Sequence, residues 1–323
     1  MKCLVTGAAG FIGSHLCETL LASGHEVVGL DAFIPYYPRL WKESNLSHCQ
    51  SHSSFTFLER DLRTDPLEDT VREIDWVFHL AAMPGLVRSW SDFDLYHTCN
   101  LVATQRLLEA LRSAAPRLER FVLGSTSSVY GRFASGDETL PTQPISPYGV
   151  TKLAAEHLAR AYATNYGLPL VILRYFSVYG PRQRPDMGYF QFIRAIQQGE
   201  VVTVTGDGHQ TRSNTFVHDC VAATIAATRA PVGEIYNVGG GETASVWDIL
   251  DRLTRLTGLS PQIERRPARL GDQRHTQADT AKLFAHLGWK AQTSLDEGLA
   301  TQVQWQHNLL STPGSTPPAP SGR

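Results

Sequence analysis

The sequence predicts an α/β protein built on a Rossmann-type, doubly wound parallel sheet, followed by a smaller C-terminal lobe of mixed α/β structure that binds substrate. Two observations support this fold class. Short apolar strands and amphipathic helices alternate through the first 180 residues, which is typical of a parallel sheet. The first strand also runs into a glycine-rich turn and an apolar helix, the arrangement of a dinucleotide site. With 323 residues, 42% of them hydrophobic, the chain can bury a sizeable core.

Apolar runs bounded by turn residues define the strands, and ligands are expected at the carboxyl ends of these strands. We expect strands at 1–6, 26–30, 55–58, 76–80, 121–123 and 171–173. Patterns with a helical period predict helices at 11–21, 66–73, 98–112 and 147–166.

The pattern loosens after residue 180. Helices near 187–198, 221–228, 246–256 and 278–287, with a strand at 201–205, suggest a mixed lobe. We therefore expect a dinucleotide-binding domain at 1–180, to which parts of 214–240 return, and a second lobe at 181–310. The tail at 311–323, STPGSTPPAPSGR, is predicted to be disordered, because its composition cannot bury a core.

The glycine-rich turn is the first candidate site. Gly7 allows the tight turn, Gly10 lets backbone approach a pyrophosphate, and Gly13 lets the helix pack on the strand, with the helix N-terminus facing the anion. Asp31 ends the second strand, 18 residues after Gly13, where its carboxylate can accept both hydroxyls of an adenosine ribose. The cofactor is therefore predicted to be NAD rather than NADP, since Asp31 would repel a 2'-phosphate and no arginine follows it immediately.

The second candidate site combines Tyr148 and Lys152 with the hydroxyl cluster at 125–128. A tyrosine and a lysine four residues apart lie on one helix face, so the ammonium can lower the pKa of the phenol and stabilise its anion. A hydroxyl upstream can bind the substrate oxygen. This combination predicts the movement of a proton on an alcohol.

Charge and composition exclude several classes of function. A net charge of −2 with mixed signs gives no reason to expect nucleic acid or an acidic membrane as a partner, and no apolar run approaches the roughly 20 residues of a membrane span. Met1 leads directly into the first strand, so a cytoplasmic location is expected. The five cysteines form no C-x-x-C and are predicted to be reduced. No metal site is predicted, since His48-Cys49-x-x-His52 lies in a polar, serine-rich loop without a second pair of ligands.

Taken in order, the motifs resemble those of the extended short-chain dehydrogenase/reductases, in the branch of nucleotide-sugar epimerases and dehydratases. Nearly everything except the tail is covered, through TGAAGFIGSH at 6–15, HLAA at 79–82, STSSVYG at 125–131, YGVTK at 148–152, GDGHQTR at 206–212, YNVGGG at 236–241 and RLGDQRHTQAD at 269–279. Within that branch, AAMPGLVRSW at 81–90 and PRQRPDM at 181–187 are similar to UDP-glucuronate 4-epimerases.

The resemblance assigns roles to these residues. It implies Tyr148 as the acid/base, Lys152 as its partner, and Ser125, Thr126 and Ser127 as hydroxyls near C4 and the sugar carboxylate. It implies a tightly bound NAD, regenerated in each cycle, at Gly7, Gly10, Phe11, Ile12, Gly13, Asp31, Asp61, Leu62, Leu80, Ala81, Ala82, Asn100, Tyr148, Lys152 and Tyr175. It implies a UDP-sugar bound at 181–310 and at the active site by Arg88, Ser127, Ser128, Ser177, Arg184, Gly188, Tyr189, Val204, Arg212, Arg269 and Asp272. It also implies a homodimer through the helices at 98–112 and 147–166.

The chemistry implied is a reversible oxidation. Tyr148 takes the proton of the sugar 4-hydroxyl while hydride passes from C4 to NAD, and hydride then returns to the opposite face of the 4-keto sugar. With UDP-glucuronate this ketone is a β-keto acid that loses carbon dioxide readily. The carboxylate must therefore be held, with Ser177, Thr126, Ser127 and either Arg184 or Arg88 as candidates.

Three hypotheses follow. The first is 4-epimerisation of UDP-glucuronate to UDP-galacturonate without decarboxylation. The second is another UDP-hexose 4-epimerase, of the UDP-glucose/galactose type, or a UDP-glucuronate decarboxylase. The third is a non-catalytic NAD-sensing protein. Ser128 stands where related decarboxylases carry a glutamate, Ser177 is nearer to the threonine of UDP-glucuronate epimerases than to the asparagine of UDP-glucose epimerases, and Thr126-Ser127 cannot supply the acidic pair of the dehydratases.

Overall fold

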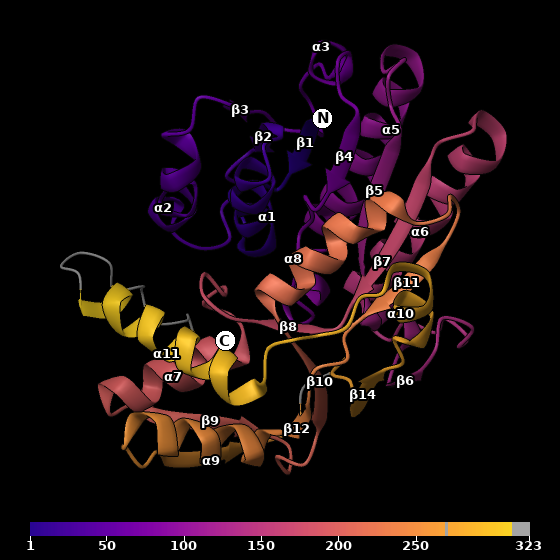
Figure 1. Ribbon diagram of the computed structural model, residues 1–323. Coiled ribbons are helices and arrows are strands. Elements are labelled where there is room, and N and C mark those ends of the chain that lie inside the picture. The colour runs from indigo at the N-terminus through magenta and orange to yellow at the C-terminus, as the bar shows by residue number, and fades with distance from the viewer. Residues whose placement is uncertain (269–270, 312–323) are drawn as a thin grey trace.

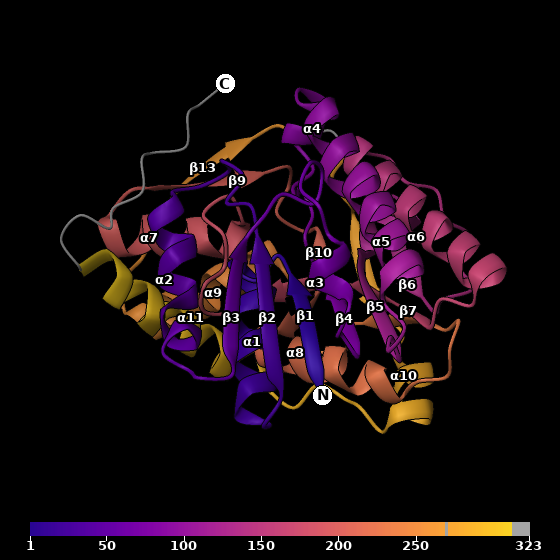
Figure 2. The ribbon, with the colours of Figure 1, turned by 90° about the horizontal axis from the view of Figure 1, so that it is seen from above.

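The centre of the molecule is a parallel sheet with the strand order β11-β7-β5-β4-β1-β2-β3 (Figures 1 and 2). The computed structural model describes residues 1–268 and 271–311, and within them this sheet has seven strands. They are β1 (Lys2–Thr6), β2 (Glu26–Asp31), β3 (Phe55–Glu59), β4 (Trp76–His79), β5 (Arg120–Thr126), β7 (Leu170–Tyr175) and β11 (Ile235–Val238). The predicted Rossmann-type fold class is confirmed.

Both faces of the sheet are covered by helices, because successive strand residues are apolar. Cys3 and Val5 of β1 face a core that contains residues of α1 (Phe11–Ala22) and α8 (Val217–Ala226), while Leu4 faces a core with α5 (Ala103–Ala114) and α6 (Pro147–Tyr166). Strands buried on both faces are typical of parallel sheets. Shorter elements complete this part: α2 (Arg39–Gln50), α3 (Glu68–Val71), α4 (Phe93–His97), a π-helix (Thr98–Val102) and 3₁₀ turns at Arg88–Trp90, Ser127–Tyr130 and Ala227–Arg229.

A second, mixed α/β lobe lies below the central sheet in the view of Figure 1. Its described part has two small sheets, one of order β12-β10-β14-β6 with β8 beside β10, and one that pairs β13 with β9. The strands are β6 (Phe133–Gly136), β8 (Ser177–Tyr179), β9 (Val201–Thr205), β10 (Thr211–Phe216), β12 (Thr243–Ser245), β13 (Gln262–Arg266) and β14 (His275–Ala278). The helices are α7 (Gly188–Gln198), α9 (Val246–Thr257), α10 (Ala281–Leu287) and α11 (Leu295–Ser311).

The chain passes between the two parts more than once. β11, from the second half of the chain, pairs with β7 in the central sheet, whereas β6, from the first half, pairs with β14 in the second lobe. The second lobe is therefore hydrogen-bonded to β6, the strand that follows the hydroxyl cluster at 125–128.

The structure differs from the sequence prediction at α2. Residues 48–52 were expected in a polar loop, but His48 and Cys49 lie in α2, and that prediction was wrong. The buried face of this helix includes Lys42 and Asn45 beside Trp41 and Leu46, so its hydrophobic period is broken. Of the tail predicted to be disordered, Ser311 ends α11 and 312–323 lie outside the described residues. Within the described residues, none of the helices has both the length and the apolar character needed to cross a membrane.

Candidate active site

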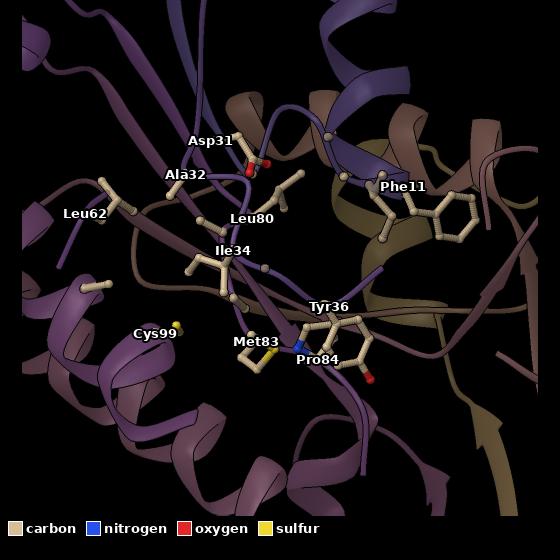
Figure 3. A pocket seen from close by; sticks show the side chains of 18 of the residues that line it. Phe11, Asp31, Ala32, Ile34, Tyr36, Leu62, Leu80, Met83, Pro84 and Cys99 are labelled. Atoms are coloured by element: carbon tan, nitrogen blue, oxygen red, sulfur yellow. The ribbon is translucent and has the colours of Figure 1, made fainter. Parts of the chain in front are cut away.

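A cavity opens where the strand order reverses between β1 and β4 and runs from Asp31 to the start of α6. Figure 3 shows part of its lining, with Asp31, Leu80 and Tyr36 among the labelled side chains. All the predicted cofactor residues except Asn100 line the cavity. Asn100 lies behind the wall: its amide donates to the Met83 carbonyl and to Thr151, and its oxygen accepts from the Met83 nitrogen. It therefore supports the loop after β4 and links that loop to α6.

The backbone of the glycine-rich turn, with Gly7, Gly10 and Gly13, forms the floor of the cavity. Gly7 has φ +74°, and a Cβ placed there would lie 2.9 Å from the Ala81 nitrogen. A Cβ at Gly13 would lie 2.2 Å from the Gly7 carbonyl oxygen. Glycine is required at both positions, and the N-terminus of α1 can thereby approach a bound anion.

Asp31 lies at one end of the cavity, as the last residue of β2. Its two carboxylate oxygens accept from the backbone nitrogens of Phe33 at 2.8 Å and Ala9 at 3.2 Å. Burial raises the pKa of Asp31, and the ammonium of Lys42 opposes that shift. The carboxylate is thus held in place while Lys42, which donates to the Ile34 carbonyl, balances its charge.

Asp61 forms the other wall of this end. Arg63 binds its carboxylate through Nε and Nη2, and this hydrogen bonding lowers the pKa of Asp61. Lys42 and Arg63 were both missed by the sequence analysis, as were four other lining residues that follow Asp31, namely Ala32, Ile34, Tyr36 and Tyr37. The available signal was the aromatic and basic run YYPRLWK at 36–42, directly after the strand that ends in Asp31.

Tyr148 stands at the opposite end, in the first turn of α6. Ser146 caps this helix by accepting from the Gly149 nitrogen, and Pro147 fits its first turn. Burial raises the pKa of Tyr148, and hydrogen bonding from Thr126 and the charge of Arg184 oppose that shift. The sequence argument expected Lys152 to lower this pKa, but in the structure Thr126 and Arg184 are the groups that lower it, and desolvation is the larger effect.

Lys152 is buried one turn further along α6. Its ammonium donates to the Gly124 carbonyl at 2.6 Å, at the end of β5. Burial lowers its pKa to about 8, and the carboxylate of Glu156 opposes this shift. Lys152 therefore remains charged near neutral pH and is fixed to the strand that leads into the hydroxyl cluster.

The members of that cluster have different partners. Thr126 is the hydroxyl that interacts with Tyr148, and it also accepts from the Ser128 nitrogen at 3.1 Å. Ser125 instead donates to Glu156, and Ser127 donates to Gln273 of the second lobe. The predicted group of three catalytic hydroxyls is thus divided among three environments.

Two arginines approach the rim of the cavity beside Tyr36. The Arg184 guanidinium binds Asp186 through two hydrogen bonds of 3.0 Å, and the Tyr36 hydroxyl donates to Asp186 at 3.1 Å. Arg88 binds Asp92, and both guanidinium groups lie over the Tyr36 ring, Arg88 at 5.3 Å and Arg184 at 5.8 Å from its centroid. Of these two candidates for the carboxylate, Arg184 is the one among the described residues that lines the cavity.

The other predicted substrate residues lie in or near the second lobe. The Arg212 guanidinium binds the Asp272 carboxylate at 2.6 Å. The Tyr189 hydroxyl donates to the side chain of Asn214 in β10, and Asn214 is the strand partner of Ser177 in β8. Gly188 begins α7. Val204 is fully buried in the core. Arg269 lies outside the described residues.

The cavity fits an NAD molecule. A glycine floor and a helix N-terminus suit a pyrophosphate, and Asp31 offers a carboxylate to a ribose. The far end presents Tyr148 and Lys152. Fold and site together define a dinucleotide-dependent enzyme of the short-chain dehydrogenase/reductase type.

Comparison with known proteins specifies the family. Residues 3–239 match the model of the NAD dependent epimerase/dehydratase family, and the chain belongs to it. Its cofactor is NAD, as predicted. The chain is 42% identical over 314 residues to the uncharacterized UDP-glucose epimerase YtcB of Bacillus subtilis (strain 168), covering 96% of this chain and 99% of that protein.

Two further similar proteins are named for UDP-glucuronate rather than UDP-glucose. The UDP-glucuronate 4-epimerase of Thermodesulfobacterium geofontis (strain OPF15) is 37% identical, covering 94% of this chain and 95% of that protein. The structure of UDP-glucuronic acid 4-epimerase from Bacillus cereus with UDP-glucuronic acid and NAD has a TM-score of 0.93 and 43% identity, covering 96% of this chain and 100% of that one. The predicted resemblance to UDP-glucuronate 4-epimerases is confirmed.

The structure predicts that Asp31 selects the cofactor. Asp31→Asn keeps one hydrogen-bond acceptor but removes the charge, so we expect affinity for NAD to fall by about tenfold and the preference over NADP to shrink. Calorimetric titration of cofactor-stripped protein with each nucleotide would measure both. Glu59→Gln is a matched control, because Glu59 is the β3 neighbour of Asp31 and pairs with Arg39 outside the cavity. An unchanged NAD:NADP ratio in Asp31→Asn would contradict this role.

Proposed function

We propose that the protein converts UDP-glucuronate to UDP-galacturonate by epimerisation at C4, without decarboxylation. One observation carries this proposal: Arg184 lines the same cavity as Tyr148 and acts electrostatically on its phenol. A cation therefore lies beside the group that would meet the 4-hydroxyl, in the region where the carboxylate on the adjacent C5 would be held. Two of the relatives described above also bear the name of this activity.

In the proposed reaction Tyr148 is the acid/base. As the phenolate, its oxygen would receive the proton of the sugar 4-hydroxyl, and Thr126 is placed to hold the same oxygen because it already interacts with Tyr148. Lys152 supplies a fixed positive charge one helical turn away. NAD, when bound, would supply a reversible acceptor for the hydride of C4. Gly7, Gly10 and Gly13 would hold its pyrophosphate, and Asp31 its adenosine ribose.

The oxidised sugar must be kept from losing carbon dioxide. Decarboxylation of a β-keto acid requires the breaking bond to align with the carbonyl π system, so a fixed carboxylate can be held out of alignment. We assign this to the planar fork of Arg184, which suits bidentate binding of a carboxylate. Ser127, whose orientation is set by Gln273, and Ser177 at the start of β8 are further contacts in the proposal. Ser128 offers a hydroxyl and no acid.

The UDP end would be anchored by the second lobe. Arg212 and Asp272 form one partly buried pair there, and Gly188 and Tyr189 lie at the start of α7. An arginine gripping the diphosphate leaves the hexose to be held by adaptable contacts, so that both faces of the ketone can be presented.

A second candidate is a UDP-glucose 4-epimerase. The pairing of Arg184 with Asp186 favours it, because a neutralised guanidinium can lie beside an uncharged hexose. The name of the Bacillus subtilis relative points the same way. The two candidates differ in whether Arg184 exchanges Asp186 for a substrate carboxylate.

Direct turnover separates these candidates. Purified protein incubated with UDP-glucuronate should form UDP-galacturonate, observed by NMR without added reductant, because NAD is regenerated in each cycle. UDP-glucose, tested in parallel, should turn over more slowly. Release of a UDP-pentose or a 4-keto pentose would indicate decarboxylation, and retained NAD without any turnover would support a sensing role.

Removing the phenol hydroxyl tests the base. Tyr148→Phe should lower kcat by about 10²-fold or more, since proton transfer by a positioned side chain contributes on that scale, and should leave NAD content nearly intact. Tyr162→Phe is the matched control on the same helix, because Tyr162 bonds Glu109 far from the cavity. Substantial residual turnover by Tyr148→Phe would assign the base elsewhere.

The two arginines can be compared with each other. Arg184→Met should lower kcat/KM for UDP-glucuronate by about tenfold or more while changing that for UDP-glucose less, because a hydrogen-bonded charge pair is lost with the acid substrate alone. Arg88→Met should show the smaller effect on this ratio, since Arg88 binds Asp92. Equal losses with both substrates in Arg184→Met would place Arg184 at the diphosphate or in a structural role.

A further inference from the structure

A buried cluster of charges lies behind Tyr148, and the sequence analysis did not find it. Lys152, Glu156 and Arg174 are 5%, 2% and 4% exposed. Lys152 and Glu156 are four residues apart on α6, and Arg174 reaches them from β7. Charges buried to this degree are costly unless they are paired and hydrogen-bonded.

Both oxygens of the Glu156 carboxylate accept hydrogen bonds. Oε1 accepts from Arg174 Nε at 3.1 Å and from the Ser125 hydroxyl, and Oε2 accepts from Arg174 Nη2 at 2.7 Å. The remaining Arg174 nitrogen, Nη1, donates to the Tyr130 hydroxyl at 2.9 Å, and Tyr130 donates in turn to Asn237 at 2.7 Å. Glu156 thus connects α6 with β5 and β7, and through Tyr130 with β11.

Lys152 lies between this ion pair and the cavity. Its ammonium donates to Gly124, the residue before Ser125, so two neighbouring residues of β5 are bonded to two neighbouring turns of α6. Burial alone favours the neutral amine, and the negative charge of Glu156 opposes this effect. Without the carboxylate, Lys152 and Arg174 would be two buried cations in the same interior.

The other groups facing the cluster cannot replace this charge. Burial lowers the pKa of His79 in β4 to about 3, and the positive charge of Lys152 lowers it in the same direction, so His79 is neutral. Burial raises the pKa of Tyr130 and of Tyr148, so both are phenols at neutral pH in the apo protein. Glu156 is therefore the anion that faces Lys152 in the described part of the chain.

We propose that Glu156 is a positioning residue for the reaction: paired with Arg174, it keeps Lys152 in its charged form and holds the end of β5 against α6. It acts through Lys152 and does not reach the substrate. The proposal rests on the role of Lys152 in the proposed function. It adds a third member to the Tyr148-Lys152 face of α6, one turn deeper in the protein.

The test is to remove the charge and follow the titration of Lys152 directly. The chain has five lysines, so ¹³C-lysine labelling gives few NMR signals, and Lys152→Arg assigns the signal of interest. The carboxylate favours the ammonium, so in Glu156→Gln the ammonium should be lost at lower pH, with a titration midpoint about one unit or more below that of the wild type. The descending limb of the pH dependence of kcat should move in the same direction.

Three variants complete the experiment. Glu156→Asp keeps the charge and should restore most of the midpoint. Glu18→Gln breaks the partly buried Glu18–Arg182 pair on α1 and should leave the Lys152 midpoint unchanged. If Glu156→Gln does not fold, the double variant Glu156→Gln/Arg174→Met removes both charges, a replacement that buried pairs often tolerate. Its Lys152 midpoint should also be lowered, by less than in Glu156→Gln, because the repulsion from Arg174 is lost as well.

The outcomes are distinct. A folded Glu156→Gln or double variant with the wild-type Lys152 midpoint would overturn the proposal, even if its activity were low, because a merely structural role moves stability without moving this titration. A wild-type protein that does not epimerise UDP-glucuronate would overturn the proposed function. Even in that case, the NMR titration would still show whether Glu156 raises the titration midpoint of Lys152.

Discussion

The structure depends on a close contact of backbone with backbone at the point where β1 and β4 end. Gly7 has no room for a Cβ beside Ala81, and Gly13 has none beside Gly7. This contact brings the N-terminus of α1 to the carboxyl ends of the strands and places the loops after β2, β4 and β5 around one cavity. An anion-binding helix end and a reactive tyrosine can therefore belong to the same site although 137 residues separate Phe11 from Tyr148.

Buried charges impose a second constraint on this cavity, because each one needs a partner from another element. Lys42 of α2 balances Asp31 at one end of the cavity, and Arg174 of β7 balances Glu156 behind Lys152 at the other. These pairs join segments that are distant in the sequence. The charged pairs around the cavity thus also hold helices against strands of the central sheet. A substitution in one of these pairs would therefore affect both the site and the packing around it.

The sequence predicted the elements whose signal is local. The helix 147–166 was predicted with its observed ends, because Ser146, Pro147 and Gly167 mark them, and apolar runs located the central strands. The strands of the second lobe were largely missed, since β13 is exposed along its length and several others have three or four residues. Glu156 and Lys42 could not be recognised because their importance comes from partners on other elements, and the helix that carries Lys42 was not predicted.

The charge balance around Arg184 bears on the choice between an acidic and a neutral sugar. Arg184 is paired with Asp186, which is a third exposed, and a pair open to solvent contributes about 1 kcal/mol or less. Exchanging Asp186 for a substrate carboxylate therefore costs little and leaves the charge near Tyr148 unchanged, since one carboxylate replaces another. A neutral hexose leaves the pair intact and gains nothing from it. Under the proposed function the arrangement would therefore admit both sugars and favour the acid, because the Arg184 side chain is more buried than that of Asp186, and a charge pair is stronger where there is less water.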